Sequence, residues 1–278
     1  MVKHRLVNTP FRALLIPALC AFAASAAQAG CSRPMNVPMS ATGQSVMIAD
    51  NEISGIYPEL LQLLAKEGCE FLLTAVPRAR QELMFETGKA DLLIPASKTP
   101  RRDELGIFVP LIRNRATVIS LDSKRPPLKS ADELLERKDT RVVLVRGADY
   151  GVPYQELMEA LSKQNRLLLE SDPIAVARVL KANPGDVTIM APVIFTGAIQ
   201  DDPRVSDLID RLRVEPLNEL PWGESGVYLS RAALNKEDTA TLLAMMNRAA
   251  QSGVVWKGFQ TYYPASVLKE SIKPRDAK

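Results

Sequence analysis

The sequence predicts an α/β protein built of two lobes. Short apolar runs alternate along the chain with stretches whose apolar residues recur at helical spacing. The chain breaks near Arg125-Pro126-Pro127, and the same alternation then starts again. Strands that alternate with helices favour parallel sheets covered on both faces. Each lobe is therefore expected to be a mostly parallel sheet flanked by helices.

The individual elements follow from the same periodicities. In the first half, strands are expected over Phe71–Val76 and Asp91–Pro95 and helices over Tyr57–Lys66 and Ala79–Gly88. After the break, the expected pieces are a helix over Ser130–Arg137, a strand over Arg141–Val145, a turn at Gly147, the segments Val187–Met190, Pro192–Ala198 and Leu208–Val214, a strand over Gly226–Ser230, and helices over Asn235–Gln251 and Val255–Tyr262.

Residues 1–30 have the pattern of a cleavable signal peptide. Basic residues at Lys3, Arg5 and Arg12 precede an apolar run that ends in Ala27-Gln28-Ala29. We expect export to the periplasm, and no later stretch approaches the roughly 20 apolar residues of a membrane helix.

Charge and residue types exclude several kinds of function. The chain has 35 Lys and Arg against 32 Asp and Glu, and the signal peptide holds three of the basic residues and none of the acidic ones. The mature chain is then neutral, which argues against nucleic acid as a partner. The one histidine, His4, leaves with the signal peptide, so neither a histidine base nor a histidine metal site is expected. We expect no cofactor, no metal and a monomer.

Two cysteines, Cys31 and Cys69, remain after Cys20 is removed. Exported proteins with two cysteines commonly pair them, so a disulfide is expected. The alternative is that Cys31 becomes a lipid-modified first residue, because Ala29-Gly30-Cys31 partly matches a lipoprotein cleavage box. Gln28 stands where that box requires Leu.

The order of motifs resembles the family 3 extracellular solute-binding proteins, the polar amino-acid binders of ABC importers. The resemblance covers nearly all of the mature chain. It rests on Gly55-Ile56-Tyr57-Pro58-Glu59-Leu60-Leu61, Glu86-Thr87-Gly88-Lys89-Ala90-Asp91-Leu92, Ser97-Lys98-Thr99-Pro100-Arg101-Arg102, Phe108-Val109-Pro110, Ser130-Ala131-Asp132-Glu133-Leu134, Val143-Leu144-Val145-Arg146-Gly147, Gly226-Val227-Tyr228-Leu229, Gly253-Val254-Val255-Trp256 and Tyr262-Tyr263-Pro264.

The resemblance implies a type II periplasmic-binding-protein-like fold with two hinge crossings, near Ala116–Asp122 and Trp222–Tyr228. The first lobe would then combine residues 31–118 with 225–278, and the second would span 119–224. A small solute would bind between the lobes and be passed to an inner-membrane ABC permease, with no enzymatic activity.

In the first lobe, Arg102 matches the arginine of the family's Thr-Pro-x-Arg segment. The resemblance implies that this arginine binds a carboxylate of the ligand. The other reading is a solvated loop arginine. Ser97 and Thr99 could add a hydroxyl and a backbone N–H, or simply form a turn. Arg80 resembles the arginine of a Pro-Trp-x-Arg segment, with Arg78 at the tryptophan position, or it is a solvated residue on a first helical turn.

The second lobe departs from the amino-acid-binding pattern. Ala148 stands where members carry Thr, and Ala191 where they carry the Asp that contacts the ligand's amino group. Asp149 either takes over that contact or caps the helix that starts near Val152. Tyr150 could supply an aromatic wall of the site. We expect an anionic or zwitterionic, amino-acid-like solute.

Glu224 and Trp222 lie at the second crossing, where they face the ligand or serve packing and solvation. Two alternative functions stay open. One is a dehydratase-type enzyme on the same scaffold, with Glu224, Asp149 or Glu52 as its acid–base carboxylate. The other is a sensor component that presents its ligand-closed form to a receptor.

Overall fold

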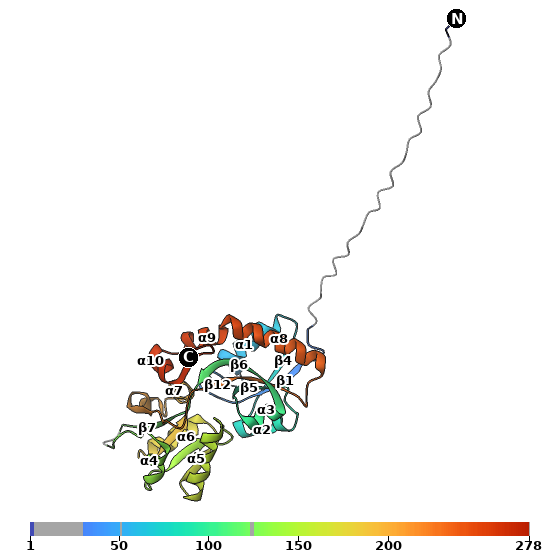
Figure 1. The fold of residues 1–278 in the computed structure, drawn as a ribbon. Helices are drawn as coiled ribbons and strands as arrows, with labels where there is room; N and C mark the ends of the chain where they lie inside the picture. The colour runs from blue at the N-terminus through green and yellow to red at the C-terminus, as the bar shows by residue number, and fades with distance from the viewer. Residues whose placement is uncertain (3–29, 51, 123–124, 278) are drawn as a thin grey trace.

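The computed structural model describes residues 1–2, 30–50, 52–122 and 125–277. The predicted signal peptide lies almost entirely outside these described residues. Within them, two sheets with their own helices form two lobes (Figure 1). No helix in the described ranges is both long enough and apolar enough to cross a membrane.

The first lobe is built from both ends of the described chain. A four-stranded sheet has the order β13-β6-β12-β5, and a parallel pair, β1-β4, lies beside it. The strands are β1 Met35–Met39, β4 Phe71–Ala75, β5 Leu92–Ser97, β6 Gly106–Asn114, β12 Gly223–Ser230 and β13 Ile272–Pro274, with a small hairpin of β2 Met47–Ala49 and β3 Glu52–Ser54. The helices are α1 Ile56–Ala65, α2 Arg78–Glu86, α3 Pro100–Leu105, α8 Lys236–Ser252, α9 Val254–Tyr262 and α10 Ala265–Ser271.

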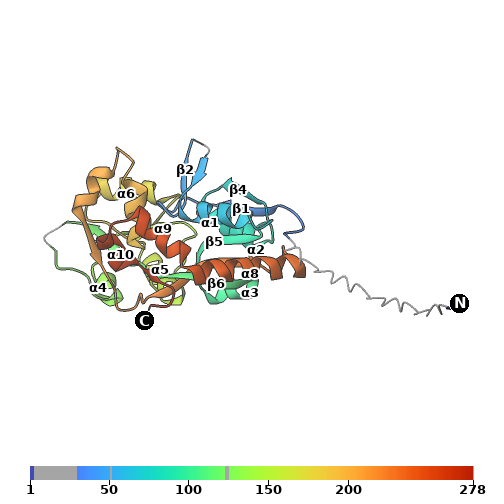
Figure 2. The same cartoon turned by 90° about the horizontal axis from the view of Figure 1, so that it is seen from above.

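The second lobe contains a five-stranded sheet in the order β11-β7-β10-β8-β9. Its strands are β7 Thr117–Leu121, β8 Val142–Val145, β9 Leu167–Glu170, β10 Val187–Met190 and β11 Leu212–Glu215. Its helices are α4 Ala131–Glu136, α5 Val152–Lys163, α6 Pro173–Ala182, α7 Pro192–Ile199 and the 3-10 helix η1 Ser206–Arg211. Seen from above, α4 and α6 lie at the opposite end of the molecule from β1 and β4 (Figure 2).

The chain passes from the first sheet to the second between Asn114 and Thr117 and returns between Glu215 and Gly223. Because β12 enters the first sheet on this return, it lies between β5 and β6 and runs antiparallel to both. The four-stranded sheet is therefore antiparallel, whereas the sequence pattern predicted a mostly parallel one. The lobe boundaries predicted near residues 118 and 225 stay a prediction.

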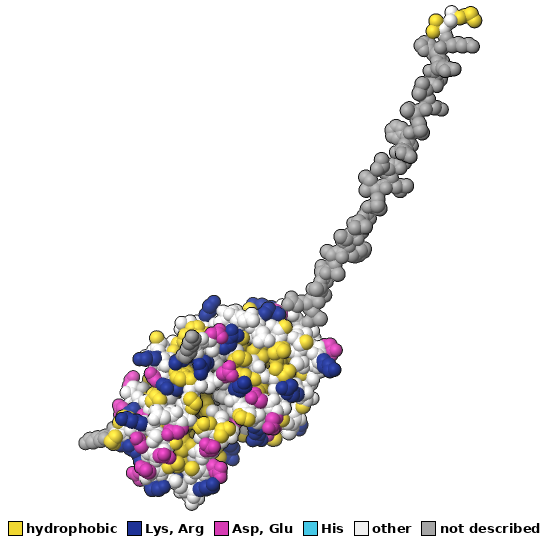
Figure 3. Space-filling model, in the orientation of Figure 1, with side chains coloured by type: hydrophobic (Ala, Val, Ile, Leu, Met, Phe, Trp, Pro, Cys, Tyr) yellow, Lys and Arg dark blue, Asp and Glu magenta, His cyan; other side chains and the backbone are white. Residues whose placement is uncertain are grey.

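Alternating side chains of the second sheet supply two cores. Val142 and Leu144 of β8 pack on one face with Tyr154 of α5, while Val143 packs on the other with Val176 of α6. This follows from the period of two in a strand, and β8 is apolar throughout because helices cover both faces. On the surface, acidic and basic side chains are interspersed over the face that Figure 3 shows.

Cys31 and Cys69 form a disulfide, as expected from the sequence. It joins the start of the described mature chain to the segment just before β4, and Cys69 is buried in the first-lobe core. The bond uses the Cys31 Sγ atom that a lipid thioether would require, so disulfide and lipidation exclude each other at this residue.

Replacing both cysteines by serine should lower the free energy of unfolding by about 3–4 kcal/mol, because the bond closes a loop between residues 38 apart. Chemical denaturation of the mature protein measures this difference. Thiol titration of the unreduced, denatured protein should find no free thiol. Two free thiols would contradict the disulfide.

Candidate functional site

A cavity lies between the two sheets, with an empty volume of about 610 Å³ counted out to its opening. Its walls come from both lobes, and the second-lobe wall includes the carboxyl ends of β8 and β10, where ligands bind in open α/β sheets. The lining residues are Ala41, Thr42, Arg78, Pro95, Ala96, Ser97, Asn114, Val145, Ala148, Asp149, Tyr150, Pro173, Ile189, Met190, Ile194 and Ser225.

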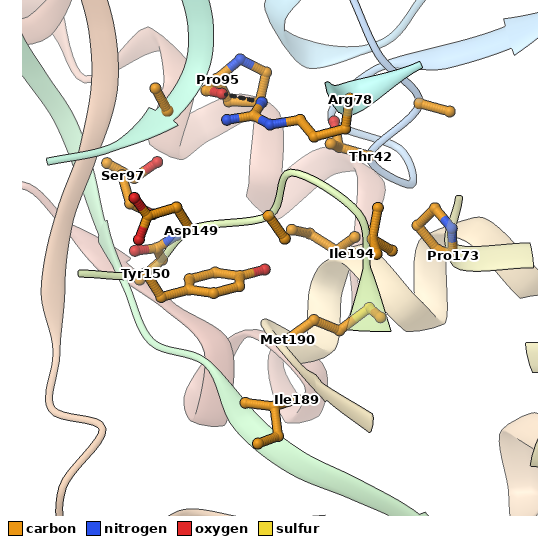
Figure 4. A pocket seen from close by; sticks show the side chains of 16 residues that line it. Thr42, Arg78, Pro95, Ser97, Asp149, Tyr150, Pro173, Ile189, Met190 and Ile194 are labelled. Atoms are coloured by element: carbon orange, nitrogen blue, oxygen red, sulfur yellow. Dashed lines mark hydrogen bonds between the residues drawn. The ribbon is translucent and has the colours of Figure 1, made fainter. Parts of the chain in front are cut away.

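Arg78 is the cation of the first-lobe wall. It is the first residue of α2, and its side chain is 11% exposed. Nη1 donates to the Pro95 carbonyl at 2.9 Å, and Nη2 lies 2.5 Å from Oε1 of Glu82, one helical turn further on. Figure 4 shows the guanidinium held against Pro95 at the edge of the cavity. Burial lowers the pKa of Arg78, and the Glu82 carboxylate acts in the opposite direction.

Glu82 is shared by two arginines. From the side opposite Arg78, Arg102 donates Nη2 to Oε1 of Glu82 at 2.8 Å and Nε to Oε2 at 3.2 Å. Burial acts to raise the pKa of Glu82, but the two guanidiniums outweigh it and hold that pKa below its ordinary value. We call Arg78, Glu82 and Arg102 the two-arginine cluster. It carries one positive charge in excess.

Gln81 fixes α2 against the sheet. The side chain is fully buried, and Nε2 donates to the carbonyls of Pro38 in β1 and Ile94 in β5 at 2.8 and 3.1 Å. Its Oε1 accepts from Arg78 Nη1 at 3.1 Å. Because these bonds join three elements, the start of α2 and the Arg78 side chain have one position relative to the cavity.

The second-lobe wall carries Asp149 and Tyr150. Asp149 Oδ1 accepts from the Gly151 N–H at 2.8 Å and Oδ2 from Gln155 Nε2 at 3.0 Å. These bonds form a turn just before α5, whose N-cap is Gly151 and has no side-chain cap, so Asp149 is not the cap of that helix, and the same carboxylate lines the cavity. The Tyr150 ring packs edge-on against Tyr154, and its hydroxyl lies 3.4 Å from the backbone N of Ala191. Burial raises the pKa of Tyr150.

Neutral polar groups complete the lining. Thr42, Ser97, Asn114 and Ser225 all come from the first lobe. Within the described part of the chain, the buried Oγ1 of Thr42 has no hydrogen-bond partner. A buried hydroxyl without a partner is costly, so a polar ligand atom at this wall would be favoured.

The residues predicted from the sequence are only partly brought together. Ser97, Asp149 and Tyr150 line the cavity, whereas Thr99 caps α3 through a bond from the Arg102 N–H and is buried. Arg102 is buried behind the wall, where the Glu82 carboxylate and the Ser97 carbonyl accept hydrogen bonds from its guanidinium.

Arg80 and Glu52 are exposed and do not line the cavity. Glu224 does not line the cavity either, and its Oε2 lies 3.7 Å from Lys98 Nζ. Trp222 is stacked against Arg115 and Lys273 instead. Of the three carboxylates considered for acid–base chemistry, only Asp149 is at the cavity. No group of three potential metal-binding side chains occurs among the described residues.

Arg78 is the charged cavity residue that the sequence did not indicate, and the polar residues Thr42, Asn114 and Ser225 were not predicted either. The resemblance drew attention to Arg80, because Arg78 occupies a tryptophan position of the pattern. The signal available was the spacing of Arg78 and Glu82, which places an ion pair on successive helical turns directly after a strand.

Several contacts join the lobes beside the cavity, and two of them are described here. Gly147 of the second lobe approaches the start of α2 so closely that a Cβ there would lie 2.8 Å from the Ala79 Cα. On the other side, the Tyr263 hydroxyl donates to the Val193 carbonyl at 2.8 Å and accepts from the Gln44 N–H at 3.0 Å. The two lobes are therefore in contact on the borders of the cavity.

The architecture is that of two-lobed substrate-binding proteins, which confirms the predicted fold. The chain is similar to an amino acid ABC transporter substrate-binding protein from Streptococcus pneumoniae, solved with L-arginine, at 20% identity and a TM-score of 0.65 over 84% of this chain and 96% of that one. A putative L-cystine ABC transporter protein from Listeria monocytogenes is 15% identical, with a TM-score of 0.65 over 84% and 97%. EhuB, solved with hydroxyectoine, is 13% identical, with a TM-score of 0.64 over 86% and 92%. No protein-family profile and no curated protein sequence matches the chain.

The hydrogen bonds that Asp149 accepts before and within α5 can be tested separately from its charge. Asp149→Ala should lower the free energy of unfolding by about 1 kcal/mol, because the Gly151 N–H and the Gln155 amide lose their acceptor. Asp149→Asn keeps a side-chain oxygen and should cost less than half as much. Urea denaturation of the three proteins tests this, and equal stability of Asp149→Ala and the parent would refute this role of the two bonds.

Proposed function

We propose that the protein is a periplasmic solute-binding protein that captures a small anionic or zwitterionic solute, amino-acid-like in size, for an ABC importer. The observation that carries this proposal is the excess positive charge of the two-arginine cluster, whose Arg78 lines the cavity between the lobes. Because Glu82 is shared between Arg78 and Arg102, one buried positive charge is left without its own carboxylate, and an anionic group of the solute is favoured beside Arg78.

Asp149 supports a zwitterion. Among the described residues that line the cavity, Arg78 and Asp149 are the two that carry charge, and they come from different lobes. In Figure 4, Arg78 lies near Thr42 and Pro95, while Asp149 lies with Tyr150 and Ser97. A solute with an anionic end and a cationic or donor end can therefore bind both lobes at once, which favours the closed form.

The importer role is supported by the similar structures. Two of them are described as proteins of ABC transporters, and the solutes named for two, L-arginine and hydroxyectoine, each contain a carboxylate. Export through residues 1–30 agrees with delivery in the periplasm. The binding role is also favoured over an enzyme because a single carboxylate, Asp149, lines the cavity and is held by two donors.

Arg78→Gln should weaken solute binding by roughly 2–5 kcal/mol, because the solute's anion loses its partner. A thermal-shift screen against amino acids, dicarboxylates and polyamines identifies the probe, and calorimetry gives the affinities. Arg80→Gln is the matched control, since Arg80 is an exposed arginine of the same helix. A best probe without an anionic group, or an unchanged affinity for Arg78→Gln, would contradict the proposal.

Gly147→Val should impair closure, because its Cβ would overlap the Ala79 Cα of the opposite lobe. We expect small-angle scattering to show that the best probe of the screen reduces the radius of gyration of the parent but not of the variant. Gly151→Ala is the control: Gly151 also has a positive φ of 97°, yet a Cβ there meets nothing within 4 Å. Closure of Gly147→Val to the parent's radius would show that this contact does not limit closure.

A further inference from the structure

Arg102 and Glu82 lie outside the cavity lining, although they adjoin a residue inside it. The Arg102 side chain is 3% exposed and the Glu82 side chain 14%. Three nitrogens of Arg102 donate to protein oxygens, two of them on Glu82 and the third the Ser97 carbonyl. Three of the five guanidinium N–H groups of Arg102 are thus bound within the protein, and the side chain is buried outside the cavity lining, so Arg102 does not present a bidentate fork to a solute in the cavity.

Among the described residues, no printed ion pair links the cluster to a further charge. Arg101 pairs with Glu86 at 2.7 Å, Lys98 Nζ lies 3.7 Å from Glu224 Oε2, and the Asp103 carboxylate accepts from the Tyr228 hydroxyl at 2.8 Å. Without Arg102, Glu82 would neutralise Arg78 completely. With Arg102 present, one carboxylate serves two guanidiniums, and the unmatched charge is at the cavity wall.

We propose that Arg102 and Glu82 determine which solute charge the site accepts, without touching the solute. Arg102 compensates the charge of Glu82, so that the charge of Arg78 stays available to one anionic group. This inference rests on the proposed function and assigns the residues of that site that set its charge selectivity. A net charge of one matches a single carboxylate. A second carboxylate on the solute would meet no further cation among the described cavity residues.

Three variants change the charge count in different directions. Arg102→Gln reduces the cluster to zero, Glu82→Gln raises it to two, and the double variant E82Q/R102Q returns it to one with Arg78 alone. L-Glutamine and L-glutamate are matched probes, because they share a skeleton and differ by one negative charge. Calorimetry of both probes, with the other common amino acids, acetate and succinate screened by thermal shift, gives the selectivity.

We expect R102Q to bind L-glutamine at least roughly tenfold more weakly than the parent, because an uncompensated Glu82 competes for Arg78. Arg102→Lys keeps the compensating charge and should stay within about threefold. E82Q should shift the affinity ratio toward L-glutamate by about tenfold or more. The double variant should recover L-glutamine binding that R102Q loses, a rescue that a purely structural role would not produce.

Direct contact of Arg102 with the solute predicts the reverse pattern: Arg102→Lys would lose binding as R102Q does, and E82Q/R102Q would not recover it. Either result overturns the inference while leaving the proposed function intact. If the parent protein responds to no carboxylate of the panel, the proposed function itself fails. Arg80→Gln is again the control, and melting temperatures without a probe report whether each variant folds. Should E82Q not fold, Arg102→Lys against R102Q still decides the question.

Discussion

The shared carboxylate of Glu82 is the interaction on which the site depends. Two arginines are buried beside each other, and their repulsion is tolerable only because one carboxylate accepts from both. The shared carboxylate also joins three elements, since Arg102 is on α3, Glu82 on α2, and Arg102 donates to the end of β5. Gln81, next to Glu82, anchors the same helix to β1 and β5. The same group of hydrogen bonds around Glu82 therefore sets both the position of Arg78 and the net charge at the cavity wall.

The topology explains why this cluster faces a second lobe. The chain leaves the first sheet after β6 and returns as β12. The cavity lies beside these two crossings and is bounded by strands of both sheets. Ser225 of β12 and Asn114 of β6 line the cavity beside the crossings, and the Arg78 wall and the Tyr150 wall belong to different sheets. Closure brings the Gly147 turn against the start of α2, where only a residue without Cβ fits. The fold thus places the charged wall next to the contact that closes the cavity.

Local periodicity was sufficient for much of the fold and insufficient for the site. The helix at α8 and the strand at β10 were predicted within one residue, because their apolar spacing is regular and their neighbours cover them. The insertion of β12 between β5 and β6 depends on residues more than a hundred positions apart, which no local pattern encodes. The same holds for Arg102: its motif was recognisable, but the Glu82 that takes its donors lies 20 residues earlier on another helix. For Asp149 the sequence left a helix cap and a ligand contact open; the structure puts Gly151 at the cap and Asp149 in a turn that lines the cavity.

The second-lobe wall shows how recognition can continue without the usual carboxylate at position 191. A carboxylate offers about four acceptor sites, and Asp149 uses two of them, for the Gly151 N–H and the Gln155 amide. Two sites remain for a cationic or donor group of a solute, held in place by these two hydrogen bonds. The space near Ala191 is bounded instead by the Tyr150 hydroxyl, and apolar side chains of Ile189, Met190 and Ile194 surround it. A solute whose donor group points toward Asp149 would bury its apolar part against these side chains. On the proposed function, Asp149 rather than residue 191 would therefore supply the acceptor for a donor group of the solute, opposite Arg78.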